Sequence, residues 1–345
     1  MKIIADVMGS DKGSLELVSG AVAALREYEG IELILVGNEN EIKKALDECK
    51  CDASSVEIVH TETVIEMCDD PLCVNRAKAD SSMSTGLRLL KEGKGDAFVS
   101  AGNTGALFAG ASLIVRKIKG LNRPAIATVL PMTPPVLLLD SGANINVTPD
   151  YLLQFAIIGS EYMKKMYGLE SPRVGLLNNG SEETKGTELQ LSTYALLKEC
   201  DSVNFVGNVE GNKISQNACD VLVTDGFTGN ILLKNIEGMG KLMMSTLKGL
   251  FTANLGTKMA YLLTKKQLGA VKKNFDSSEH GGAPLLGIAK PVIKAHGSSN
   301  AKAFKNAIRQ AAAYANSGMI EELATKSAEL FPKKKTVETT HSQQE

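Results

Sequence analysis

Residues 96–110 combine glycine with small polar side chains in a pattern that could bind an anion. Residues 97–100 form a short apolar run typical of a buried strand, and an apolar segment of helical period continues to residue 118. Between them lie Gly102, Asn103, Thr104 and Gly105. A strand, a glycine-rich turn and a helix together place backbone N–H groups at a helix start, where the helix dipole favours an anion. The glycine spacing matches neither the dinucleotide fingerprint nor the Walker loop, so an ordinary strand-to-helix turn remains the alternative.

Four other expected strands end in similar glycine-containing polar segments, at residues 6–11, 140–144, 178–186 and 225–230. Ligands of open α/β sheets bind at the carboxyl ends of the strands. The repetition therefore predicts a shared, highly hydrogen-bonding pocket. We expect Asp6, Asn144 and Asn178 to contact substrate there.

Two His-Gly segments follow later in the chain, beginning at His280 and His296. The second stands just before an expected helix, which predicts anion binding by His296, Ser298 and Ser299. A lone histidine is more often structural, and we interpret His60 and His341 in that way.

The familiar nucleophile motifs are missing from the sequence, including Gly-x-Ser-x-Gly and His-Glu-x-x-His. A site rich in backbone donors, Asn, Lys and His, with no covalent nucleophile of its own, suits a substrate that is both anionic and the nucleophile. Inorganic phosphate is such a substrate. The residues by themselves thus predict an anion-handling α/β enzyme.

The overall composition excludes several other classes of protein. The 345 residues carry a net charge of −1 and no Trp, which argues against a nucleic-acid partner. The six cysteines have no zinc-like spacing, so we interpret them as reduced thiols and expect no metal. The first residues enter a strand directly and no apolar run could span a bilayer, which predicts a cytoplasmic protein.

The chain alternates between strand and helix patterns over most of its length. Expected strands cover residues 2–7, 31–36, 56–60, 97–100, 125–130, 136–140, 173–177, 203–207 and 220–224, and expected helices cover 14–28, 39–48, 80–90, 149–166, 183–199, 300–316 and 319–330. This alternation predicts a doubly wound, mostly parallel sheet with helices on both faces. Only five residues separate strands 125–130 and 136–140, too few for a crossover helix, so we expect one antiparallel pair there.

Residues 231–263 form a long helical stretch that is broken at residues 250–256. We expect a helical hairpin, inserted at 231–275 in an α/β catalytic domain of one or two lobes (residues 1–331), followed by a disordered tail at 332–345. Lys258, Lys265, Lys266, Lys272 and Lys273 flank an apolar tip that contains Leu250, Phe251, Leu255, Met259 and Leu262. Such a tip fits a membrane surface, whereas the hairpin stems fit a dimer contact equally well.

Longer runs of sequence are more specific than any of these motifs. The sequence resembles the phosphate acyltransferase family, PlsX, of bacterial phospholipid synthesis, from residue 1 to about residue 330. The matching runs include residues 81–93, 96–107, 152–156, 182–186, 208–211, 225–233 and 280–287. The resemblance implies a fold similar to phosphotransacetylases and to isocitrate- and isopropylmalate-type dehydrogenases.

The family's reaction transfers a fatty acyl group from acyl carrier protein to inorganic phosphate. The resemblance also implies a homodimer, peripheral membrane association and delivery of acyl phosphate to a glycerol-3-phosphate acyltransferase that makes phosphatidic acid. We expect bound phosphate to attack the thioester directly, with no metal or organic cofactor.

Lys185 is our first choice for orienting phosphate or stabilising the oxyanion. The alternative, a surface lysine in the first turn of the expected helix 183–199, would place a cation at the positive end of the helix dipole. We further expect Asp225 and Asn230 to position neighbouring groups, and His280 to protonate the leaving thiolate.

Two other functional classes remain open from the sequence. One is a nicotinamide-dependent dehydrogenase on a related fold, although the dinucleotide fingerprint is missing. The other is a non-catalytic scaffold that binds carrier protein and membrane. An assay for acyl phosphate, with NAD reduction followed in parallel, distinguishes the three.

Overall fold

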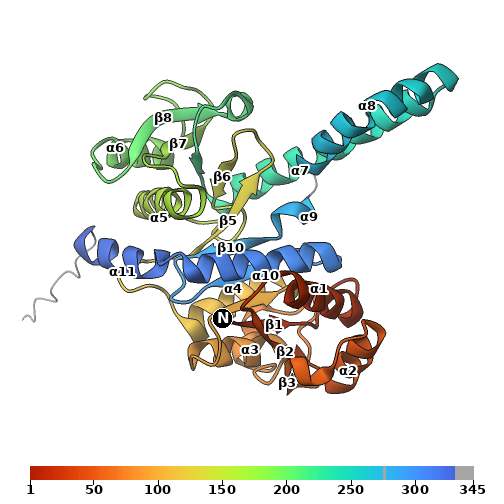
Figure 1. Cartoon of the computed structure of the whole chain (residues 1–345). Helices are drawn as coiled ribbons and strands as arrows, with labels where there is room; N and C mark the ends of the chain where they lie inside the picture. The colour runs from red at the N-terminus through yellow and green to blue at the C-terminus, as the bar shows by residue number, and fades with distance from the viewer. Residues whose placement is uncertain (275–276, 331–345) are drawn as a thin grey trace, which may run out of the picture.

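The computed structural model describes residues 1–274 and 277–330 (Figure 1). Its strands are β1 (Lys2–Asp6), β2 (Glu32–Gly37), β3 (Glu57–His60), β4 (Ala97–Ser100), β5 (Ala125–Leu130), β6 (Val136–Leu139), β7 (Arg173–Asn178), β8 (Asn204–Glu210), β9 (Val221–Val223), β10 (Gly282–Leu286) and β11 (Val292–Ala295). Its α-helices are α1 (Ser14–Glu27), α2 (Glu39–Glu48), α3 (Ser82–Lys91), α4 (Thr104–Gly110), α5 (Pro149–Tyr167), α6 (Glu188–Lys198), α7 (Gly226–Thr252), α8 (Leu255–Asn274), α9 (Ser277–His280), α10 (Ala301–Asn316) and α11 (Met319–Leu330).

Local sequence signals account for several of the helix ends. The Asn38 side chain accepts hydrogen bonds from two backbone N–H groups in the first turn of α2, and the Ser81 side chain caps α3 by accepting from the N–H of Ser84. Pro149 occupies the first turn of α5, where no N–H is needed. Gly168 ends that helix with φ +69°, a conformation that glycine adopts without strain. These signals place the helices at nearly the expected residues.

All the strands belong to one eleven-stranded sheet in the order β3-β2-β1-β4-β11-β10-β5-β6-β9-β7-β8. The predicted mostly parallel sheet is confirmed, and so is the predicted antiparallel pairing of β5 with β6. β10 adds two further antiparallel pairings, with β11 and with β5. Strands β6, β9, β7 and β8 therefore run opposite to strands β3, β2, β1, β4 and β11.

Alternate side chains of the strands build different cores on the two faces of the sheet. One face, with Ile3, Val99, Leu137 and Val221 among its residues, packs continuously against α1, α2, α5, α6, α10 and α11. The other face packs against α3 and α4 in the first half of the sheet, and against the beginning of α7 in the second half. In Figure 1 the two halves stand as stacked lobes joined through β5 and β10.

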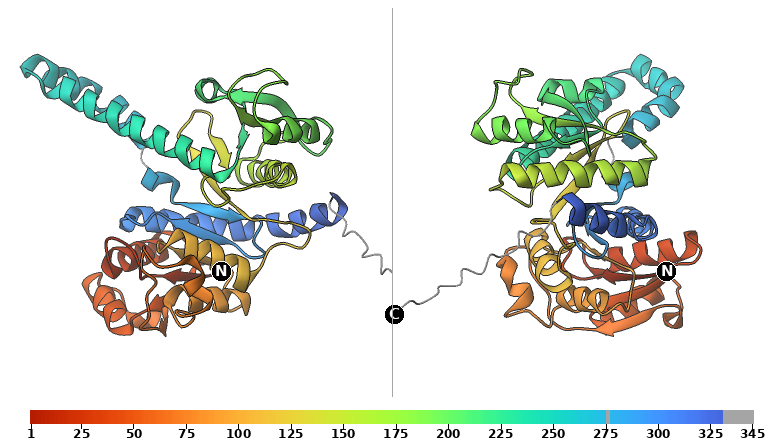
Figure 2. Two further views of the ribbon diagram at one scale, coloured as in Figure 1. Left: turned by 180° about the vertical axis from the view of Figure 1, so that it is seen from behind. Right: turned by 90° about the vertical axis from the view of Figure 1, so that its left-hand side faces the viewer.

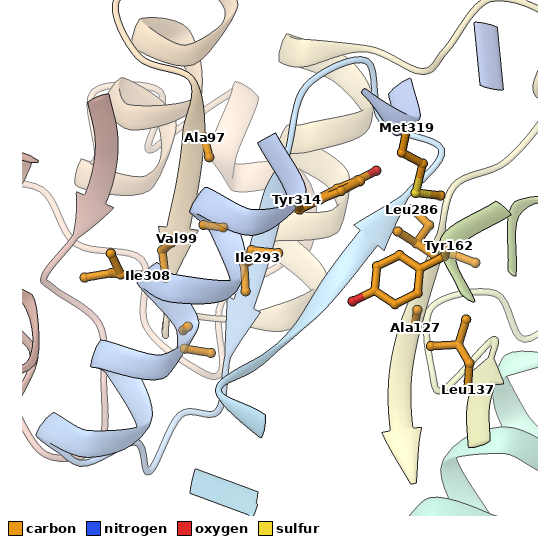
Figure 3. Packing of buried hydrophobic residues seen from close by; sticks show 14 of the residues in the cluster. Ala97, Val99, Ala127, Leu137, Tyr162, Leu286, Ile293, Ile308, Tyr314 and Met319 are labelled. Atoms are coloured by element: carbon orange, nitrogen blue, oxygen red, sulfur yellow. The ribbon is translucent and has the colours of Figure 1, made fainter. Parts of the chain in front are cut away.

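The continuous core joins the two lobes (Figure 3). Tyr162 of α5 and Tyr314 of α10 meet edge to face, with ring centroids 6.2 Å apart. Gln310 donates a hydrogen bond to the Tyr162 hydroxyl and accepts one from the backbone N–H of Gly282 in β10. Packing of this kind links α5, α10 and the central strand across the lobe boundary.

The sequence analysis missed β10 and β11, which are central strands of the sheet. Their segments hold only four or five residues each and are surrounded by glycine, proline and histidine. Short runs of this kind resemble loops until neighbouring strands pair with them. The sequence analysis therefore assigned no strand to residues 282–295, although they contain the middle of the sheet.

One helix boundary differs from expectation, whereas the break in the helical hairpin falls inside the expected residues 250–256. α6 begins at Glu188, where Thr187 and Gln190 form a capping box, and not at residue 183. The break in the helical hairpin lies at Ala253 and Asn254, and Gly256 sits inside α8. The Asn254 side chain accepts from the backbone N–H of Thr257, so a polar cap at Asn254, and not the glycine, starts the second helix.

α7 and α8 form a hairpin that projects far from the α/β body in every view (Figures 1 and 2). Leu250, Leu255, Met259 and Leu262 are exposed on it, as expected. Phe251 instead packs half-buried against Tyr261 on the opposite helix, with ring centroids 5.8 Å apart. None of the helices within residues 1–274 and 277–330 is long and apolar enough to cross a membrane. The expected tail, 332–345, falls outside the described residues.

Candidate functional site

Three polar side chains stand in a row at the carboxyl ends of neighbouring strands. Asp6 of β1 is paired in register with Ser100 of β4, and Ser100 with Lys294 of β11. Asp6 and Lys294 are 1% and 8% exposed, and Ser100 is fully buried. The sequence analysis singled out Asp6 but missed Lys294. A lysine inside the apolar run just before the His296 segment was the available signal.

The Lys294 ammonium donates to the backbone carbonyls of Ala101 and Ala295. One of its three N–H groups thus has no hydrogen-bond acceptor among the described residues. Burial lowers the pKa of Lys294 to about 8, although Asp11 and Asp6 oppose this shift. The chain accordingly holds a partly desolvated cation beside the glycine-rich turn.

Asp6 is the anion that accompanies this lysine. Burial raises its pKa to about 6, and hydrogen bonds from Ser100 and Ser82 reduce the shift. The Ser100 hydroxyl donates to Asp6 at 2.7 Å and accepts from the backbone N–H of Gly102 at 3.1 Å. The Ser100 hydroxyl therefore links the Asp6 carboxylate to the backbone of the glycine turn and helps to fix the position of Gly102.

The turns after β1 and β4 approach each other through glycine. Gly9, at φ +68°, lies so close to Gly102 that a Cβ on Gly9 would stand 3.5 Å from the Gly102 Cα. Asn103 caps α4 by accepting from the N–H of Ala106, and its amide donates to the carbonyls of Glu66, Met67 and Asp69. Asn103 thus anchors the irregular 66–69 loop over the turn. Thr104 and Gly105 begin α4 behind it.

The second predicted anion segment lies beside the first. Gly297 accepts from the Asp11 N–H, and a Cβ on Gly297 would stand 3.0 Å from an Asp11 carboxylate oxygen. His296 Nδ1 lies 2.9 Å from the Ser298 hydroxyl. The start of α10 is already occupied in part, because Glu16 accepts from the N–H of Ala301 and Asn300 from that of Ala303. Ser299 is buried, and its hydroxyl has no partner among the described residues.

His296 connects this group to the second lobe. Burial lowers its pKa, and the nearby Lys234 of α7 and Lys294 lower it further. At neutral pH this favours the uncharged imidazole. The first turns of α7 therefore lie along the site, as in Figure 1, where α7 starts at the inner side of the second lobe.

The start of α7 and the loop after β6 form a second polar group. Asp225 caps α7 by accepting from the N–H and hydroxyl of Thr228. A Cβ on Gly229 would stand 1.9 Å from the Asp140 carbonyl oxygen, so only glycine fits there. Asn230 is exposed and lies over Gly142.

The Asn144 side chain makes its hydrogen bonds within the protein and does not point a free amide toward a substrate. The side-chain amide donates to the Pro124 carbonyl and the Asp140 carboxylate, and the backbone carbonyl of Asn144 accepts from the N–H of Gly226. Burial raises the pKa of Asp140, which accepts several backbone N–H groups of its own loop. In this structure Asn144 shapes the loop that receives α7.

Lys185 lies in the loop after β7, three residues before α6, and not in a helix as expected. The argument against an ordinary surface lysine assumed that Lys185 stands in the first turn of a helix. It therefore does not apply. Lys185 is exposed, and among the described residues its ammonium has no hydrogen bond or ion pair. Asn178 donates to its backbone carbonyl, which holds the loop closed at its base.

The predicted residues thus fall into three groups. Asp6, the 102–105 turn and the 296–299 segment lie together; Asp225, Asn230 and Asn144 form the second group; Asn178 and Lys185 form the third. β9 and β7 are neighbours in the sheet, which places the second and third groups side by side. The side chain of His280, at the end of α9, lies outside the described residues. Within the described ranges no cluster of His, Cys, Asp or Glu could hold a metal ion.

Comparisons with solved structures show the fold. The chain is similar to a phosphotransacetylase from Streptococcus pyogenes, with 19% identity and a TM-score of 0.59 over 91% of this chain and 94% of that one. A branched-chain phosphotransacylase from Enterococcus faecalis gives 16% identity and a TM-score of 0.55, over 92% of this chain and 100% of that one.

Comparisons of sequence show the family. A family model described as fatty acid synthesis protein matches residues 1–322. A phosphate acyltransferase from Acetivibrio thermocellus is 45% identical over 94% of this chain and 95% of its own length. One from Fusobacterium nucleatum is 46% identical over 94% of this chain and 98% of its own length. The chain therefore belongs to the phosphate acyltransferase (PlsX) family and is an acyltransferase.

Proposed function

We propose that the protein transfers a fatty acyl group from acyl carrier protein to inorganic phosphate, releasing acyl phosphate for phosphatidic acid synthesis. The observation that carries this proposal is the buried row of Asp6, Ser100 and Lys294 beside the 102–105 turn. A desolvated ammonium with a spare N–H, next to a glycine turn, suits a small, multiply charged anion. Phosphate is such an anion and is also the nucleophile of the reaction.

Phosphate binds between Lys294 and the turn in this proposal, with the 296–299 segment on its other side. One phosphate oxygen attacks the thioester carbonyl carbon and forms the new C–O bond. The carbonyl oxygen takes up negative charge, and the C–S bond then breaks with departure of the thiolate. Holding both reactants in place accounts for much of the rate, since neither needs covalent activation by the protein.

Lys185 stabilises the developing oxyanion, and Asn230 assists it from the neighbouring group. Donors aimed at such an oxyanion commonly supply the largest share of catalysis in acyl transfer. Its exposed, unpaired ammonium supports this role for Lys185. Asp225 orients the start of α7, and His280 protonates the leaving thiolate.

The hairpin gives the product a route to the bilayer. Leu255, Leu262 and Leu263 are 81%, 64% and 81% exposed at its end, with Lys258 and Lys265 nearby. An apolar patch with a basic rim suits the surface of an anionic membrane. The helix stems join two copies into a homodimer, and membrane attachment brings the acyl phosphate to a glycerol-3-phosphate acyltransferase.

The test mixes the purified protein with acyl carrier protein thioester and orthophosphate, and traps acyl phosphate with hydroxylamine. We expect hydroxamate to form only when phosphate is present, with one free carrier thiol released for each hydroxamate. NAD reduction is followed in parallel with hydroxy acids. If none of the thioesters tested gives hydroxamate, the proposal is refuted. Reduction of NAD would instead support the dehydrogenase interpretation.

A further inference from the structure

The loop between β7 and α6 is anchored on both sides of the short turn that carries Lys185. The backbone N–H of Lys185 donates to the Glu182 carbonyl at 3.1 Å, which closes the turn. The Asn178 side chain, at the end of β7, donates to the Lys185 carbonyl at 3.1 Å. The Asn208 side chain, from the neighbouring strand β8, donates to the Glu182 carbonyl at 2.8 Å. Side chains from two paired strands therefore fix the backbone around Lys185.

Asn208 is the more deeply buried of these two anchors. It is only 9% exposed, and its Oδ1 atom has no hydrogen-bond partner in the part of the chain that the structure describes. A buried acceptor without a partner costs free energy, so asparagine is a poor residue for stability alone at this position. The contact that the Asn208 side chain does make is the one that holds the Glu182 carbonyl.

A second hold on the same loop lies at the surface. The Glu183 carboxylate accepts from the Tyr194 hydroxyl and from the Lys198 ammonium, both at 3.0 Å. The Glu183 and Lys198 side chains are 57% and 60% exposed. Ion pairs between side chains as exposed as these contribute little. The buried Asn208 amide is therefore the contact that we expect to keep the turn in place.

Gly180 determines where the Lys185 side chain can lie. A Cβ on Gly180 would stand 2.8 Å from Lys185 Cγ and 3.3 Å from Lys185 Cδ, which is closer than carbon atoms pack. The aliphatic stem of Lys185 thus lies across the Gly180 backbone, in the space that a side chain would fill. The φ angle of Gly180 is not positive, so the backbone there does not itself require glycine. The close approach of the Lys185 stem does.

A lysine that stabilises an oxyanion works best when it is already aimed at the place where the charge develops. A free lysine side chain has many rotamers, and fixing it during the reaction costs conformational entropy. An anchored turn and a stem that lies on a glycine reduce this cost for Lys185. They do so while its ammonium makes no hydrogen bond or ion pair within the described residues.

We propose that Asn208 and Gly180 are positioning residues for the acyl transfer, Asn208 by fixing the turn that carries Lys185 and Gly180 by making room for the Lys185 stem. The inference rests on the proposed function, in which the Lys185 ammonium stabilises the oxyanion. Each of the two residues acts through Lys185 and not on the substrate directly.

The experiment is a double-mutant cycle with Lys185. It measures kcat for acyl phosphate formation, and KM for phosphate, with acyl carrier protein thioester as the donor. We expect Asn208→Ala to lower kcat by about threefold to tenfold, the effect of one hydrogen bond. Gly180→Ala should lower kcat by about tenfold to a hundredfold, because the added methyl group displaces the stem. KM for phosphate should be unchanged in both variants, because phosphate binds at Lys294.

The same two substitutions are then made in the Lys185→Ala protein. There we expect each of them to change kcat by less than about twofold, because the side chain that they position is gone. A merely structural role would not show this dependence on Lys185. Gly180→Ala removes no side-chain hydrogen bond, so it tests the proposal even if Asn208→Ala fails to fold.

Each variant has a matched control. Asn204→Ala removes an exposed side-chain amide from the same strand as Asn208, where it donates to the Ser171 carbonyl. Gly211→Ala adds a methyl group directly after β8, where a Cβ meets nothing within 4 Å and the φ angle is not positive. Both controls should retain the wild-type kcat.

The outcomes separate the two levels of inference. If the wild-type protein forms no acyl phosphate, the proposed function fails and the positioning role fails with it. If acyl phosphate forms but the two substitutions lower kcat by the same factor with and without Lys185, both residues serve only the fold and the positioning role alone is refuted. Wild-type kcat in both single variants, or a rise in KM for phosphate in place of a fall in kcat, would also overturn it.

Discussion

Lys294 owes its chemistry to burial and not to its residue type. On a surface its ammonium would be fully hydrated and charged, whereas between β4 and β10 it has lost most of its water. Two backbone carbonyls and the nearby Asp6 and Asp11 carboxylates keep it cationic at neutral pH. These partners leave one N–H of the ammonium without an acceptor among the described residues, and the proposed function assigns this N–H to phosphate.

The pH dependence of phosphate binding tests this role. Because the pKa of Lys294 lies at about 8, the wild-type KM for phosphate should rise as the pH passes from 7.5 to 9.5 and the ammonium is lost. In Lys294→Met the KM should be at least about tenfold higher at pH 7.5, an effect of one charged hydrogen bond, and nearly independent of pH. A variant with wild-type KM at pH 7.5 would exclude Lys294 from the phosphate site.

Urea unfolding of the same proteins checks the sign independently. The unfolded lysine, with its usual pKa near 10.5, binds more protons than the native one between about pH 8 and 10.5. The contribution of Lys294 to the free energy of unfolding is therefore present above pH 10.5 and is lost as the pH falls through about 8. Wild-type stability should rise across this window relative to Lys294→Met. Parallel curves would mean that the lysine is not buried in solution.

Lys185 represents the opposite case, an exposed lysine without a partner. Lys185→Ala should lose about 2.7–4 kcal/mol of transition-state stabilisation, as loss of an oxyanion donor does, seen as a fall in kcat. Its free energy of unfolding should be nearly unchanged, because the side chain is exposed and its ammonium makes no hydrogen bond or ion pair within the described residues. Lys198→Ala, which removes an exposed lysine paired with Glu183, is the control. Turnover of the Lys185 variant within about threefold of wild type would remove it from the mechanism.

At the scale of elements, the glycines in the turns after β1 and β4 allow the ends of these two strands to approach each other closely. A Cβ on Gly102 would stand 2.8 Å from Met83 Cε and 3.3 Å from the Ser100 hydroxyl. Any side chain there would push into the row that joins Asp6 to Lys294. Asn103, the next residue, instead contributes through hydrogen bonds to α4 and to the 66–69 loop.

The two residues should therefore fail in different ways. Gly102→Val should abolish measurable phosphate binding, because its methyl groups occupy the approach to the turn. Asn103→Ala should weaken phosphate binding less, but should reduce the free energy of unfolding by about 1–2 kcal/mol through loss of the cap. Calorimetric titration with phosphate and urea unfolding measure the two effects. Tight phosphate binding by Gly102→Val would place the anion elsewhere.

At the scale of the whole molecule, the hairpin is the part least explained by the α/β body. A soluble monomer rarely exposes so many large apolar side chains on one projection. Leu242 and Met239 on the α7 stem are also exposed, at 59% and 57%. The stem and the tip thus offer two apolar surfaces, which the proposed function gives to a second copy and to the membrane.

Substitutions at the tip and the stem separate these assignments. Leu255→Glu combined with Leu262→Glu should abolish sedimentation with anionic liposomes, while acyl transfer in solution and the dimer persist. Leu242→Glu, the matched control on the stem, should weaken the dimer, as light scattering would show, and leave the tip intact. Continued pelleting of the tip variant would contradict the membrane role. Joint loss of dimer and activity in the tip variant would make the whole hairpin a dimer contact.

The sequence by itself determined most of the strand and helix order. Hydrophobic alternation and capping residues such as Asn38 and Ser81 act over a few residues, so they are visible before the chain folds. The short link before Val136 likewise required β5 and β6 to run antiparallel. Long matching runs of sequence indicated the family. Residue chemistry by itself predicted only an anion-handling enzyme.

Only the tertiary structure decided what surrounds each polar residue. β10 and β11 are too short to be recognised alone, and their place at the centre of the sheet comes from pairing with β4 and β5. Asn144 and Lys294 show the consequence, since the first is tied up by Pro124 and Asp140, whereas the second is buried beside the glycine turn. Burial and hydrogen-bond partners depend on residues distant in the chain, and these contacts determine whether a polar side chain is structural or available to a substrate.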